Sequence, residues 1–584
     1  MKAKKQESRK GRHASARAAA AIAEKPRAVY WPYALGCVLA LVVALEVYGP
    51  SLYGPFLFDD QYLPFSVPNF PVDSLRVWMA GVRPLLMFSY WVNYQLSGFQ
   101  TTSYHAFNIF FHTLNSVLVF LIVRKVLEFA EVEPKRRDVL AVFAGALFLL
   151  HPVNSESVAY VASRSENLSI LLFFAAFTLY LYRRTAEIAW LRAVAVLICF
   201  GAAVTTKEHT VVLPALLLLT DYFWNPPFSL AGIRRNWRLY LPMTAGGVLA
   251  AIYLAPLVRS SSSAGFSIKD FTWYQYFFTQ CRAIWLYIRL FLFPAGLNID
   301  RDFPISRTIL DQGAMVGLAA ILLAVGAAFY FRRRYPLAAY GFFAFLILMA
   351  PTSSFVPIAD PVAERRLYLS MIGLLFILLE FLRRVDVRQT RWMAALAVVL
   401  FLAAIATHSR NYVWSQKIGL WEDTAAKSPN KERVQFQLAQ AYYESNECAK
   451  ALPHYARAAE LDPKDDRLFT DWGLAYDCLN QPDQAVAKIR YALGLKPTAH
   501  GYSQLGMIFG KSGRYPEALE ALAMAAKIDP NFDMTYVYRG DVHLSAGDPA
   551  AAVQDFRQAL AINPQNQLAI HDLALAESRL GNRR

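Results

Sequence analysis

Cysteine is scarce in this chain, and its few positions form no recognisable motif. Five cysteines occur among 584 residues, at Cys37, Cys199, Cys281, Cys448 and Cys478. Their spacing matches no zinc-binding or thiol-redox motif, which argues against those classes of protein. Cys37 and Cys199 lie within apolar runs, where a cysteine serves as a small hydrophobic residue. Cys448 and Cys478 would be able to pair in an oxidising compartment, but the sequence alone does not decide whether they do.

Acidic residues are also in short supply, with 44 Asp and Glu against 59 Lys and Arg, a net charge of +15. The basic excess is not spread as a nucleic-acid patch would be. It lies in the N-terminal tail and in short loops between apolar runs, the positive-inside pattern of membrane proteins. We therefore expect a lipid bilayer and no nucleic acid among the partners. A chain of 584 residues with 56% hydrophobic and 18% charged residues predicts a membrane domain joined to a soluble domain.

Long apolar runs fill the chain as far as residue 407. Residues 1–29 are polar and basic, and the run at 32–50 lacks a small-residue cleavage site, which predicts a cytoplasmic tail and a retained first span. Ten further runs approach bilayer length, at 104–123, 139–150, 167–182, 190–206, 209–223, 239–257, 308–331, 336–356, 367–382 and 391–407. Alternation places the basic loops at 124–137, 183–184, 234–238, 332–334 and 383–391 in the cytoplasm. Eleven spans, an odd number, put everything after residue 407 outside the cytoplasm.

Residues 272–293 are the exception to this alternation. They are apolar enough to span but carry Arg282 and Arg289. Counting them as a span would place the basic cluster at 332–334 outside the cytoplasm. They are therefore interpreted as an interfacial or re-entrant helix within a long outer loop, 258–307.

Charged residues of both signs gather in the loops assigned to the outer side. Loop one follows the first span and holds Asp59 and Asp60. The later loops hold His151, Glu156, Arg164 and Glu166 in loop two, Lys207, Glu208 and His209 in loop three, Asp300, Arg301 and Asp302 in loop four, and Asp360, Glu364, Arg365 and Arg366 in loop five. Charges at the ends of membrane helices are costly unless hydrated or paired, and they often mark functional sites. The alternative is a set of ordinary interfacial ion pairs, with Asp59 and Asp60 in a solvated turn.

A polar stripe runs along the second span, where His105, Asn108, His112 and Asn115 follow an i, i+3, i+7, i+10 spacing on one helical face. The stripe is compatible with a polar channel or a ligand face. Hydrogen bonding between helices is the favoured interpretation, because polar side chains commonly join helices inside membranes.

The C-terminal part repeats at a fixed period. Pro463, Pro497, Pro530 and Pro564 close helical segments at separations of 34, 33 and 34 residues, the period of tetratricopeptide repeats. The pattern predicts a lone helix at 411–429, repeats at 432–465, 466–498, 499–532 and 533–566, and a capping helix at 567–582. The predicted fold class is therefore all-α: a polytopic membrane domain at 30–407 followed by an α-solenoid within 408–584.

Such arrays present a concave surface lined by the first helix of each repeat, and this surface usually receives peptides or proteins. The candidate residues there are Gln437, Gln440, Tyr443, Asp471, Gln504 and Tyr538. A purely scaffolding array remains the alternative.

Six segments of the membrane domain carry a family resemblance: FLFDD at 56–60, RPLLMFSYWVNYQLSG at 83–98, YHAFNIFFHTLN at 104–115, HPVNSESVAYVASRSENL at 151–168, TTKEH at 205–209 and DPVAERRLYLS at 360–370. With the repeats that follow, the chain resembles the transmembrane and tetratricopeptide-repeat-containing O-mannosyltransferases of the GT-C glycosyltransferase superfamily. The resemblance implies transfer of a sugar, expected to be mannose, from a polyprenyl-phosphate carrier to a hydroxyl of a protein acceptor, with inversion and outside the cytoplasm.

The resemblance also implies roles for particular residues. Asp59 would act as the base, beside Asp60. The second-loop acids match Glu156 and Glu166, with Arg164 between them, and the cations associated with the lipid phosphate match Lys207, Arg164 and Arg365 or Arg366. Residues 163–166 read Ser-Arg-Ser-Glu where the family often has Gly-Arg-Ala-Glu, which leaves the charges in place. The superfamily has members with and without a divalent metal ion, so a metal cofactor stays open.

The chemistry suits these residue types. A serine or threonine hydroxyl needs a positioned base, a departing phosphate needs cations, and carboxylates stabilise an oxocarbenium-like transition state. The first alternative is a non-enzymatic, membrane-anchored scaffold, for which a single span and no charged loops would suffice. A lipid or sugar carrier is the second, but its charges belong at the membrane midplane. A short inner tail fits a bacterial inner membrane with periplasmic repeats better than an endoplasmic reticulum with lumenal repeats.

Overall fold

The computed structural model describes residues 31–67, 70–260, 264–385 and 389–581. The predicted basic tail at 1–29 lies outside these residues, as do positions 386–388 of the last predicted inner loop. Within the described ranges the regular structure is helical and no strand is present beyond an isolated bridge between Ala264 and Ile358. The predicted all-α fold class is confirmed.

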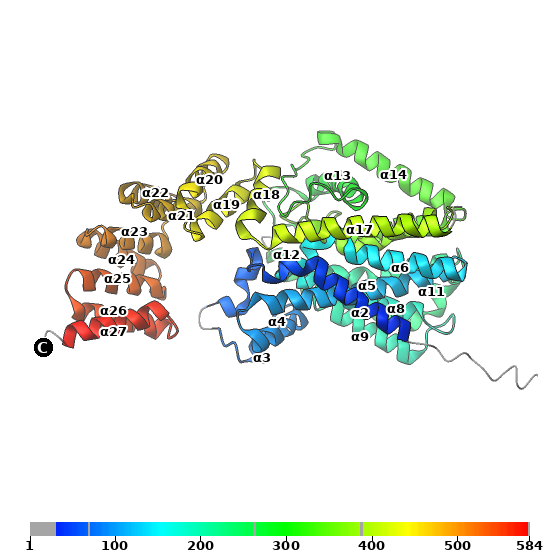
Figure 1. Ribbon diagram of the computed structural model, residues 1–584, viewed down its shortest axis with the longest axis horizontal. Helices are drawn as coiled ribbons and strands as arrows, with labels where there is room; N and C mark the ends of the chain where they lie inside the picture. The colour runs from blue at the N-terminus through cyan, green and yellow to red at the C-terminus, as the bar shows by residue number, and fades with distance from the viewer. Residues whose placement is uncertain (1–30, 68–69, 261–263, 386–388, 582–584) are drawn as a thin grey trace, which may run out of the picture.

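The first part of the chain forms a bundle, shown in blue to yellow-green in Figure 1. Its helices are α2 (Trp31–Tyr48), α3 (Leu75–Trp78), α4 (Pro84–Ser97), α5 (Thr101–Phe129), α6 (Pro134–Leu150), α7 (Ser155–Ala159), α8 (Arg164–Leu181), α9 (Trp190–Val204), α10 (Leu213–Trp224), α11 (Ala231–Arg235), α12 (Trp237–Ser260), α13 (Trp273–Leu292), α14 (Ala314–Phe331), α15 (Pro336–Met349), α16 (Leu367–Leu382) and α17 (Gln389–Trp414). Prolines stand in the first turns of α4, α6, α10 and α15, where a missing N–H costs no helical hydrogen bond. Each of the eleven predicted spans coincides with one of these helices.

The number of helices that can cross a bilayer unaided is smaller than eleven. Among the described residues, four helical segments have the necessary length and hydropathy: Trp31–Tyr53, Thr101–Phe129, Asp311–Phe331 and Thr390–Trp414. A fifth is counted if α6 and the following segment Pro152–Ala159, bent by 46° relative to it, form one span. Helices α10 and α15 have 12 and 14 residues, whereas about 20 are needed to cross the hydrocarbon core. The other predicted spans coincide with helices that do not meet this length and hydropathy threshold over the described residues, so the number of eleven spans stays a prediction. The protein is a membrane protein.

Close helix packing inside the bundle depends on small residues. Where α15 crosses α16, a Cβ added to Gly341 would lie 2.4 Å from the carbonyl oxygen of Gly373. A Cβ added to Gly373 would lie 2.6 Å from the carbonyl oxygen of Gly341. Small residues at helix crossings let backbones approach in membranes, where helices gain little from the hydrophobic effect. This crossing fixes α16, which follows directly after the charged residues of loop five.

The segment at 272–293 forms the helix α13, which packs against α14, and its interfacial or re-entrant placement stays a prediction. Arg282 donates to the carbonyl oxygen of Pro304 at 3.0 Å, and Arg289 to that of Ala295 at 3.2 Å. Both cations are therefore satisfied by the loop that follows α13.

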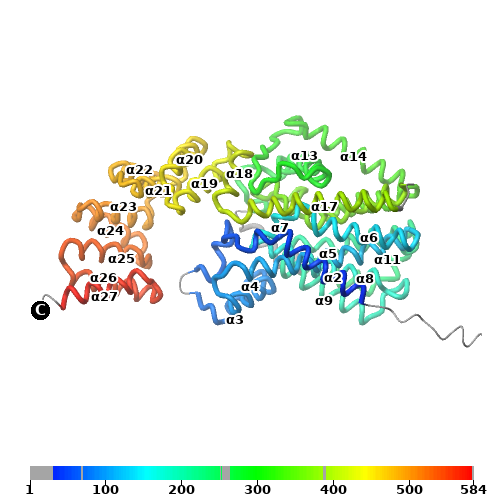
Figure 2. Tube along the Cα trace, viewed as in Figure 1, coloured from blue at the N-terminus to red at the C-terminus, as the bar shows by residue number. Residues whose placement is uncertain are grey.

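The C-terminal part is an array of paired helices, which projects from one end of the bundle in yellow to red (Figure 1). Helix α17 extends to Trp414, so the predicted domain boundary at 407–408 falls inside a continuous helix. The following helices are α18 (Lys417–Lys427), then the pairs α19 (Glu432–Glu444) and α20 (Cys448–Leu461), α21 (Asp466–Cys478) and α22 (Pro482–Leu495), α23 (Ala499–Lys511) and α24 (Tyr515–Ile528), α25 (Asp533–Ser545) and α26 (Pro549–Ile562), and last α27 (Gln567–Gly581). Figure 2 shows the trace passing from α17 through α18 directly into these pairs, which are called the repeat array below.

Candidate active site

The polar stripe of α5 binds the two loops that carry the candidate acids. His105 Nε2 lies 3.2 Å from the carbonyl oxygen of Gly54 in loop one. Asn108 Nδ2 donates to the carbonyl oxygen of Tyr160 in loop two, at 3.1 Å. Both side chains are buried. Their hydrogen bonds favour the structural interpretation of the stripe over a channel or ligand face.

The inner half of the stripe binds α16, the helix that follows the late-loop arginines. His112 Nδ1 lies 2.6 Å from the hydroxyl oxygen of Tyr368, and Asn115 Nδ2 donates to the same oxygen at 3.1 Å. Asn115 also donates to the carbonyl oxygen of Asn167 in α8, at 2.9 Å. Helix α5 thus ties loops one and two, α8 and α16 to one another.

The two aspartates of loop one occupy opposite environments. They lie in a 3₁₀ turn, η2 (Phe58–Tyr62). Asp60 is 1% exposed, and its carboxylate accepts from the backbone N–H of Leu57 at 3.0 Å and of Ala162 at 2.6 Å. Burial raises the pKa of Asp60 to about 8, against the opposing effect of these N–H groups. Asp60 therefore joins loop one to loop two.

Asp59 is exposed, and its carboxylate makes no hydrogen bond or ion pair within the described ranges. Its backbone N–H donates to the hydroxyl of Tyr160 at 3.0 Å. Of the acid pair, Asp59 alone is available to an incoming group.

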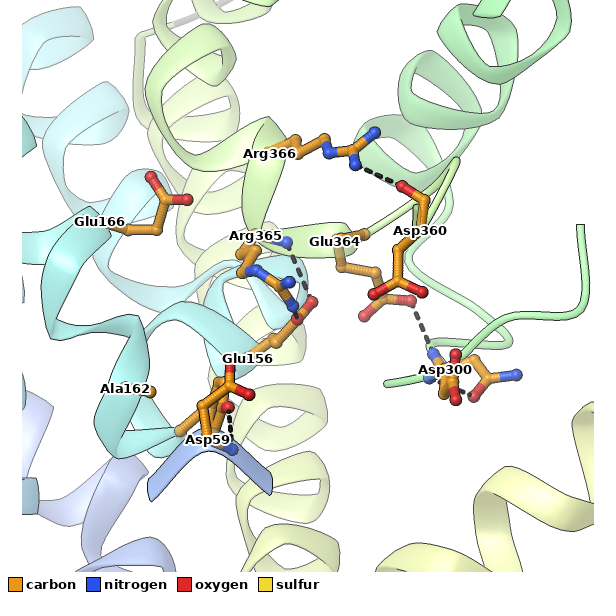
Figure 3. Close-up of polar contacts among 12 residues, drawn as sticks. Asp59, Glu156, Ala162, Glu166, Asp300, Asp360, Glu364, Arg365 and Arg366 are labelled. Carbon is orange, nitrogen blue, oxygen red and sulfur yellow. Dashed lines mark hydrogen bonds and ion pairs between the residues drawn. The ribbon is translucent and has the colours of Figure 1, made fainter. Parts of the chain in front are cut away.

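Glu156, in the helix α7 of loop two, pairs with Arg365. The backbone N–H of Arg365 donates to Glu156 Oε2 at 3.0 Å, and Arg365 Nη1 donates to Oε1. Glu156 is buried, while the Arg365 side chain keeps 29% exposure. Figure 3 shows Asp59 beside this pair, with Glu166 on one side and Glu364, Asp360 and Asp300 on the other.

Glu364 does not neutralise either arginine beside it in the sequence. It accepts from the backbone N–H of Asn298 at 2.6 Å and lies 3.4 Å from Arg301 Nη2. Burial, together with the nearby Glu156 carboxylate, raises the pKa of Glu364 to about 7. This carboxyl therefore titrates near neutral pH and fastens loop five to loop four.

Glu166 lies on the first turn of α8, just before the predicted span, and it pairs with two groups of loop three. Lys207 Nζ is 2.5 Å from Glu166 Oε1, and His209 Nε2 is 3.3 Å from Oε2. Burial opposes ionisation of Glu166, but the Lys207 ammonium outweighs it and holds the pKa of Glu166 at about 2. Glu166 is therefore a carboxylate at every physiological pH.

A third pair extends this row of charges. Arg83 Nε and Nη2 donate to the two carboxylate oxygens of Glu208 at 2.9 and 2.8 Å. The three ion pairs are close enough to interact: Glu156–Arg365, Glu166–Lys207 and Glu208–Arg83. The charge of Arg83 interacts with that of Glu166, and the charge of Arg365 interacts with those of Glu166 and Lys207. Arg83, the first residue of the segment 83–98, received no role in the site from the sequence alone. Its partner Glu208 is the residue that follows Lys207 in the sequence.

Two of the residues expected to bind the phosphate, Arg164 and Arg366, donate their hydrogen bonds to other groups of the protein. Arg164 is fully buried, and its guanidinium donates to Asn108 Oδ1 at 3.1 Å and to the carbonyl oxygens of Ser89 at 3.1 Å and Tyr104 at 2.9 Å. The expected phosphate-binding role of Arg164 is replaced by a structural one, since every one of its guanidinium nitrogens points into the protein.

Arg366 points away from Glu156. It donates to the hydroxyl of Tyr276 at 3.2 Å and to the carbonyl oxygens of Pro361, at 2.8 Å, and Asp360. Of the two adjacent arginines, Arg365 is thus the one that faces Asp59 (Figure 3).

No group of three or more His, Cys, Asp or Glu side chains suited to hold a metal ion is present among the residues that the structure describes. Asp60 is instead bound to backbone N–H groups, Glu156 to Arg365 and Glu166 to Lys207. We therefore assign no residue of this face to a metal.

The six predicted acceptor-binding residues lie on the first helix of each pair. Gln437, Gln440 and Tyr443 are half-buried on α19, Asp471 on α21 and Tyr538 on α25, whereas Gln504 on α23 is buried. Burial raises the pKa of Asp471 to about 7, and the neighbouring Asp465 adds to the shift.

The two cysteines whose pairing the sequence left open form a disulfide. Cys448, at the start of α20, is bonded to Cys478, at the end of α21. The bond joins the first helix pair of the repeat array to the second.

Comparison with known proteins identifies relatives of both parts. The tetratricopeptide-repeat family matches residues 470–531 and 503–567. The chain is 23% identical to mouse (Mus musculus) "Protein O-mannosyl-transferase TMTC3" over 614 aligned positions, which cover 92% of this chain and 65% of the relative. It is 24% identical to "Protein O-mannosyl-transferase F38B6.6" of Caenorhabditis elegans, with coverage of 73% of this chain and 63% of the relative.

The chain therefore spans slightly less than two thirds of the length of these relatives. Among solved structures, a thermophilic tetratricopeptide-repeat protein of Thermus thermophilus aligns with 31% of this chain and 95% of its own, at 17% identity and a TM-score of 0.26. The predicted resemblance to the repeat-containing O-mannosyltransferases is confirmed over most of the chain.

Proposed function

We propose that this chain is a glycosyltransferase that moves mannose from a polyprenyl-phosphate carrier to serine or threonine hydroxyls of a protein acceptor. The proposal depends chiefly on Asp59, whose exposed carboxylate has no partner among the described residues and lies next to the Glu156–Arg365 pair. The similarity of 92% of the chain to a relative named as a protein O-mannosyl-transferase supports the reaction class.

In the proposed reaction the acceptor hydroxyl oxygen attacks the anomeric carbon of the sugar. Asp59 accepts the hydroxyl proton as the new C–O bond forms, and the bond to the phosphate oxygen breaks on the opposite face, so the configuration inverts. The bonding electrons leave with the carrier phosphate. A hydroxyl gains roughly 10²–10⁴-fold in rate from a positioned base of this kind.

Arg365 and Lys207 are proposed to stabilise the departing phosphate. Within the described residues Arg365 donates only through its backbone N–H and Nη1, which leaves Nε and Nη2 for a phosphate oxygen. Lys207 uses two of its three donors, on Glu166 and on Ser165 Oγ at 3.2 Å. An arginine that keeps one carboxylate partner retains the orientation needed to bind a phosphate.

The repeat array is proposed to recruit the acceptor outside the cytoplasm. The disulfide between Cys448 and Cys478 supports that location, because disulfides persist chiefly in oxidising compartments. The concave face supplies half-buried amide and tyrosine side chains for a peptide backbone. The test is a comparison of hexose-modified Ser and Thr glycopeptides from cells that produce the wild-type chain, the Asp59→Asn variant or neither. Hexose-modified peptides should occur with the wild type alone, and equal sets in all three would refute the proposal.

A further inference from the structure

The backbone immediately before Asp59 is held in an unusual conformation. Phe58 has a φ of +45°, in the left-handed region that bulky L-residues rarely enter. Residues held there cost free energy and persist only where their surroundings enforce the conformation. Because Asp59 follows directly, the orientation of its carboxylate depends on whatever holds Phe58.

Two aromatic rings from different parts of the chain hold Phe58. Its ring packs edge-on against Trp421, with centroids 4.7 Å apart and an interplanar angle of 60°. It also packs edge-on against Tyr160 of loop two, at 6.0 Å between centroids. Tyr160 is also the residue whose hydroxyl accepts from the Asp59 N–H. Trp421 belongs to α18 and is 1% exposed, in one core with Val434 and Leu438 of the first repeat.

Helix α18 is fixed in turn to loop four of the membrane domain. Ser428 Oγ accepts from Asn298 Nδ2 at 2.7 Å and from the backbone N–H of Asp302 at 2.9 Å. Lys427 Nζ donates to the carbonyl oxygen of Leu297 at 2.8 Å. The end of α18 therefore cannot shift without breaking three hydrogen bonds to loop four.

A cluster of charges reinforces this junction at the start of α19. Arg433 donates to both oxygens of the buried Asp300 at 2.7 Å, and Lys431 pairs with the same carboxylate. Arg433 also reaches Asp360 of loop five at 2.7 Å. Loops four and five are thus joined to the start of α19, the helix that follows α18.

We propose that Trp421 is a positioning residue for Asp59. The ring of Trp421 holds Phe58 in the left-handed conformation, and this sets the direction in which the Asp59 carboxylate projects. Helix α18, which packs on the first helix pair of the repeat array, thereby completes the candidate active site. The structural part of this inference is that Trp421 holds the turn at residues 57–63, and it does not depend on the proposed function. The catalytic part is that this turn positions Asp59 for transfer, and it rests on the proposed function.

Hydrogen–deuterium exchange of the full chain in detergent tests the structural part. In Trp421→Ala, amides of residues 57–63 should exchange faster than in the wild type, because the turn loses the ring that holds it. The amides concerned include Asp60 and Leu63, whose N–H groups donate to Leu57 and Asp60 at 2.9 and 3.3 Å. Trp472→Ala is the matched control, since Trp472 is a buried indole of the second repeat that packs against Phe469 and Tyr476. Unchanged exchange at 57–63 in Trp421→Ala would overturn the proposal.

If Trp421→Ala does not fold, Phe58→Gly tests the same contact by removing the ring of Phe58. Glycine adopts a positive φ without strain, so the change removes the ring contacts with Trp421 and Tyr160 and leaves the turn conformation accessible. Faster exchange at 57–63 supports the inference, and wild-type exchange contradicts it.

Mannose transfer from a short-chain polyprenyl-phosphate mannose to a glycopeptide-derived acceptor tests the catalytic part. Trp421→Ala should lower kcat by about 10²-fold, the usual effect of a misplaced catalytic group, and leave the KM for the donor unchanged. Trp421→Phe should restore most of the rate, because the indole Nε1 of Trp421 makes no hydrogen bond within the described residues. Combining Trp421→Ala with Phe58→Gly should cost little more than Phe58→Gly alone, since that change already removes the contact between Phe58 and Trp421.

A wild-type kcat in Trp421→Ala, or multiplicative losses in the double variant, would overturn this part. An inactive wild-type chain would refute the proposed function instead, and the exchange measurement would still decide whether Trp421 holds the turn.

Discussion

Arg365 is bound to Glu156, a residue 209 positions away in the sequence, and not to its immediate neighbour Glu364. The pair brings loop five against loop two and leaves the outer edge of the guanidinium exposed beside Asp59 (Figure 3). Arg366 turns the other way and binds carbonyl oxygens of its own loop. Two adjacent arginines therefore have different tasks, one in the candidate site and one in the loop that supports it.

Donor binding should depend on Arg365 and Lys207. Arg365→Ala or Lys207→Ala should weaken the affinity for a short-chain polyprenyl-phosphate mannose by about 10–100-fold, since a hydrogen bond to a charged group contributes about 1.5–3 kcal/mol. The measurement is a binding isotherm of each purified variant in detergent. Arg124→Ala, which breaks an ion pair with Asp138 at the other end of the bundle, is the control. Unaltered donor affinity in both test variants would show that Arg365 and Lys207 do not bind the donor and serve as interfacial anchors.

Glu364 should make the junction of loops four and five sensitive to pH. The pKa of this carboxyl is about 7 in the folded chain, above its ordinary value of 4.5. Between pH 4.5 and pH 7, Glu364 is therefore protonated in the folded state and ionised in the unfolded state. The free energy of unfolding consequently falls as pH rises through this range. Glu364→Gln removes this contribution, which amounts to at most about 3 kcal/mol.

Melting temperatures in detergent between pH 5 and pH 8 measure this effect. The loss of stability toward pH 7 should be smaller in Glu364→Gln than in the wild type. Glu520→Gln, an exposed change on α24, should follow the wild-type curve. Parallel curves for wild type and Glu364→Gln would contradict the assignment.

The disulfide should stabilise the repeat array. Closing a loop of 30 residues between Cys448 and Cys478 is expected to contribute about 3–4 kcal/mol through the entropy of the unfolded chain. Cys448→Ser combined with Cys478→Ser should lower the melting temperature, and reductant should then have no further effect. Cys37→Ser, at an exposed free cysteine, is the matched control. A double variant that melts with the wild type would show that the bond does not form in the protein.

Topology can be tested with a reporter that is active only outside the cytoplasm. A fusion after Arg584 should be active and a fusion after Arg235 silent, since alternation of the basic loops puts the repeat array outside and the loop at 234–238 inside. The reverse pattern would move the candidate site to the cytoplasmic face and refute the proposed location.

Local patterns were enough to predict most of the fold. Every apolar run became a helix, and the proline period of 33 to 34 residues located the helix pairs, because both patterns repeat along the chain. The number of complete spans stays a prediction, since apolar helices such as α10 and α15 have only 12 and 14 residues. Their hydropathy reflects burial within the bundle as much as contact with lipid.

The candidate site was predictable only as a set of charged loops. The resemblance alone named Asp59 over Asp60 as the base, and it left Arg365 and Arg366 undivided. The residue patterns could separate neither pair, because each separation depends on contacts between distant segments. Asp60 is buried by the backbone of Ala162, and Arg365 is directed by Glu156. Arg164 looked like a phosphate ligand for the same reason, since its partners Ser89, Tyr104 and Asn108 lie on other helices.

The effect of Asp59→Asn on mannose transfer tests the central claim most directly. Asparagine keeps the size of the side chain but cannot accept the hydroxyl proton. Transfer from polyprenyl-phosphate mannose should therefore fall by roughly 10²–10⁴-fold while donor affinity and melting temperature stay near wild type. Asp73→Asn, at another exposed aspartate of loop one, should leave the rate unchanged. Near-normal transfer in Asp59→Asn would contradict the account.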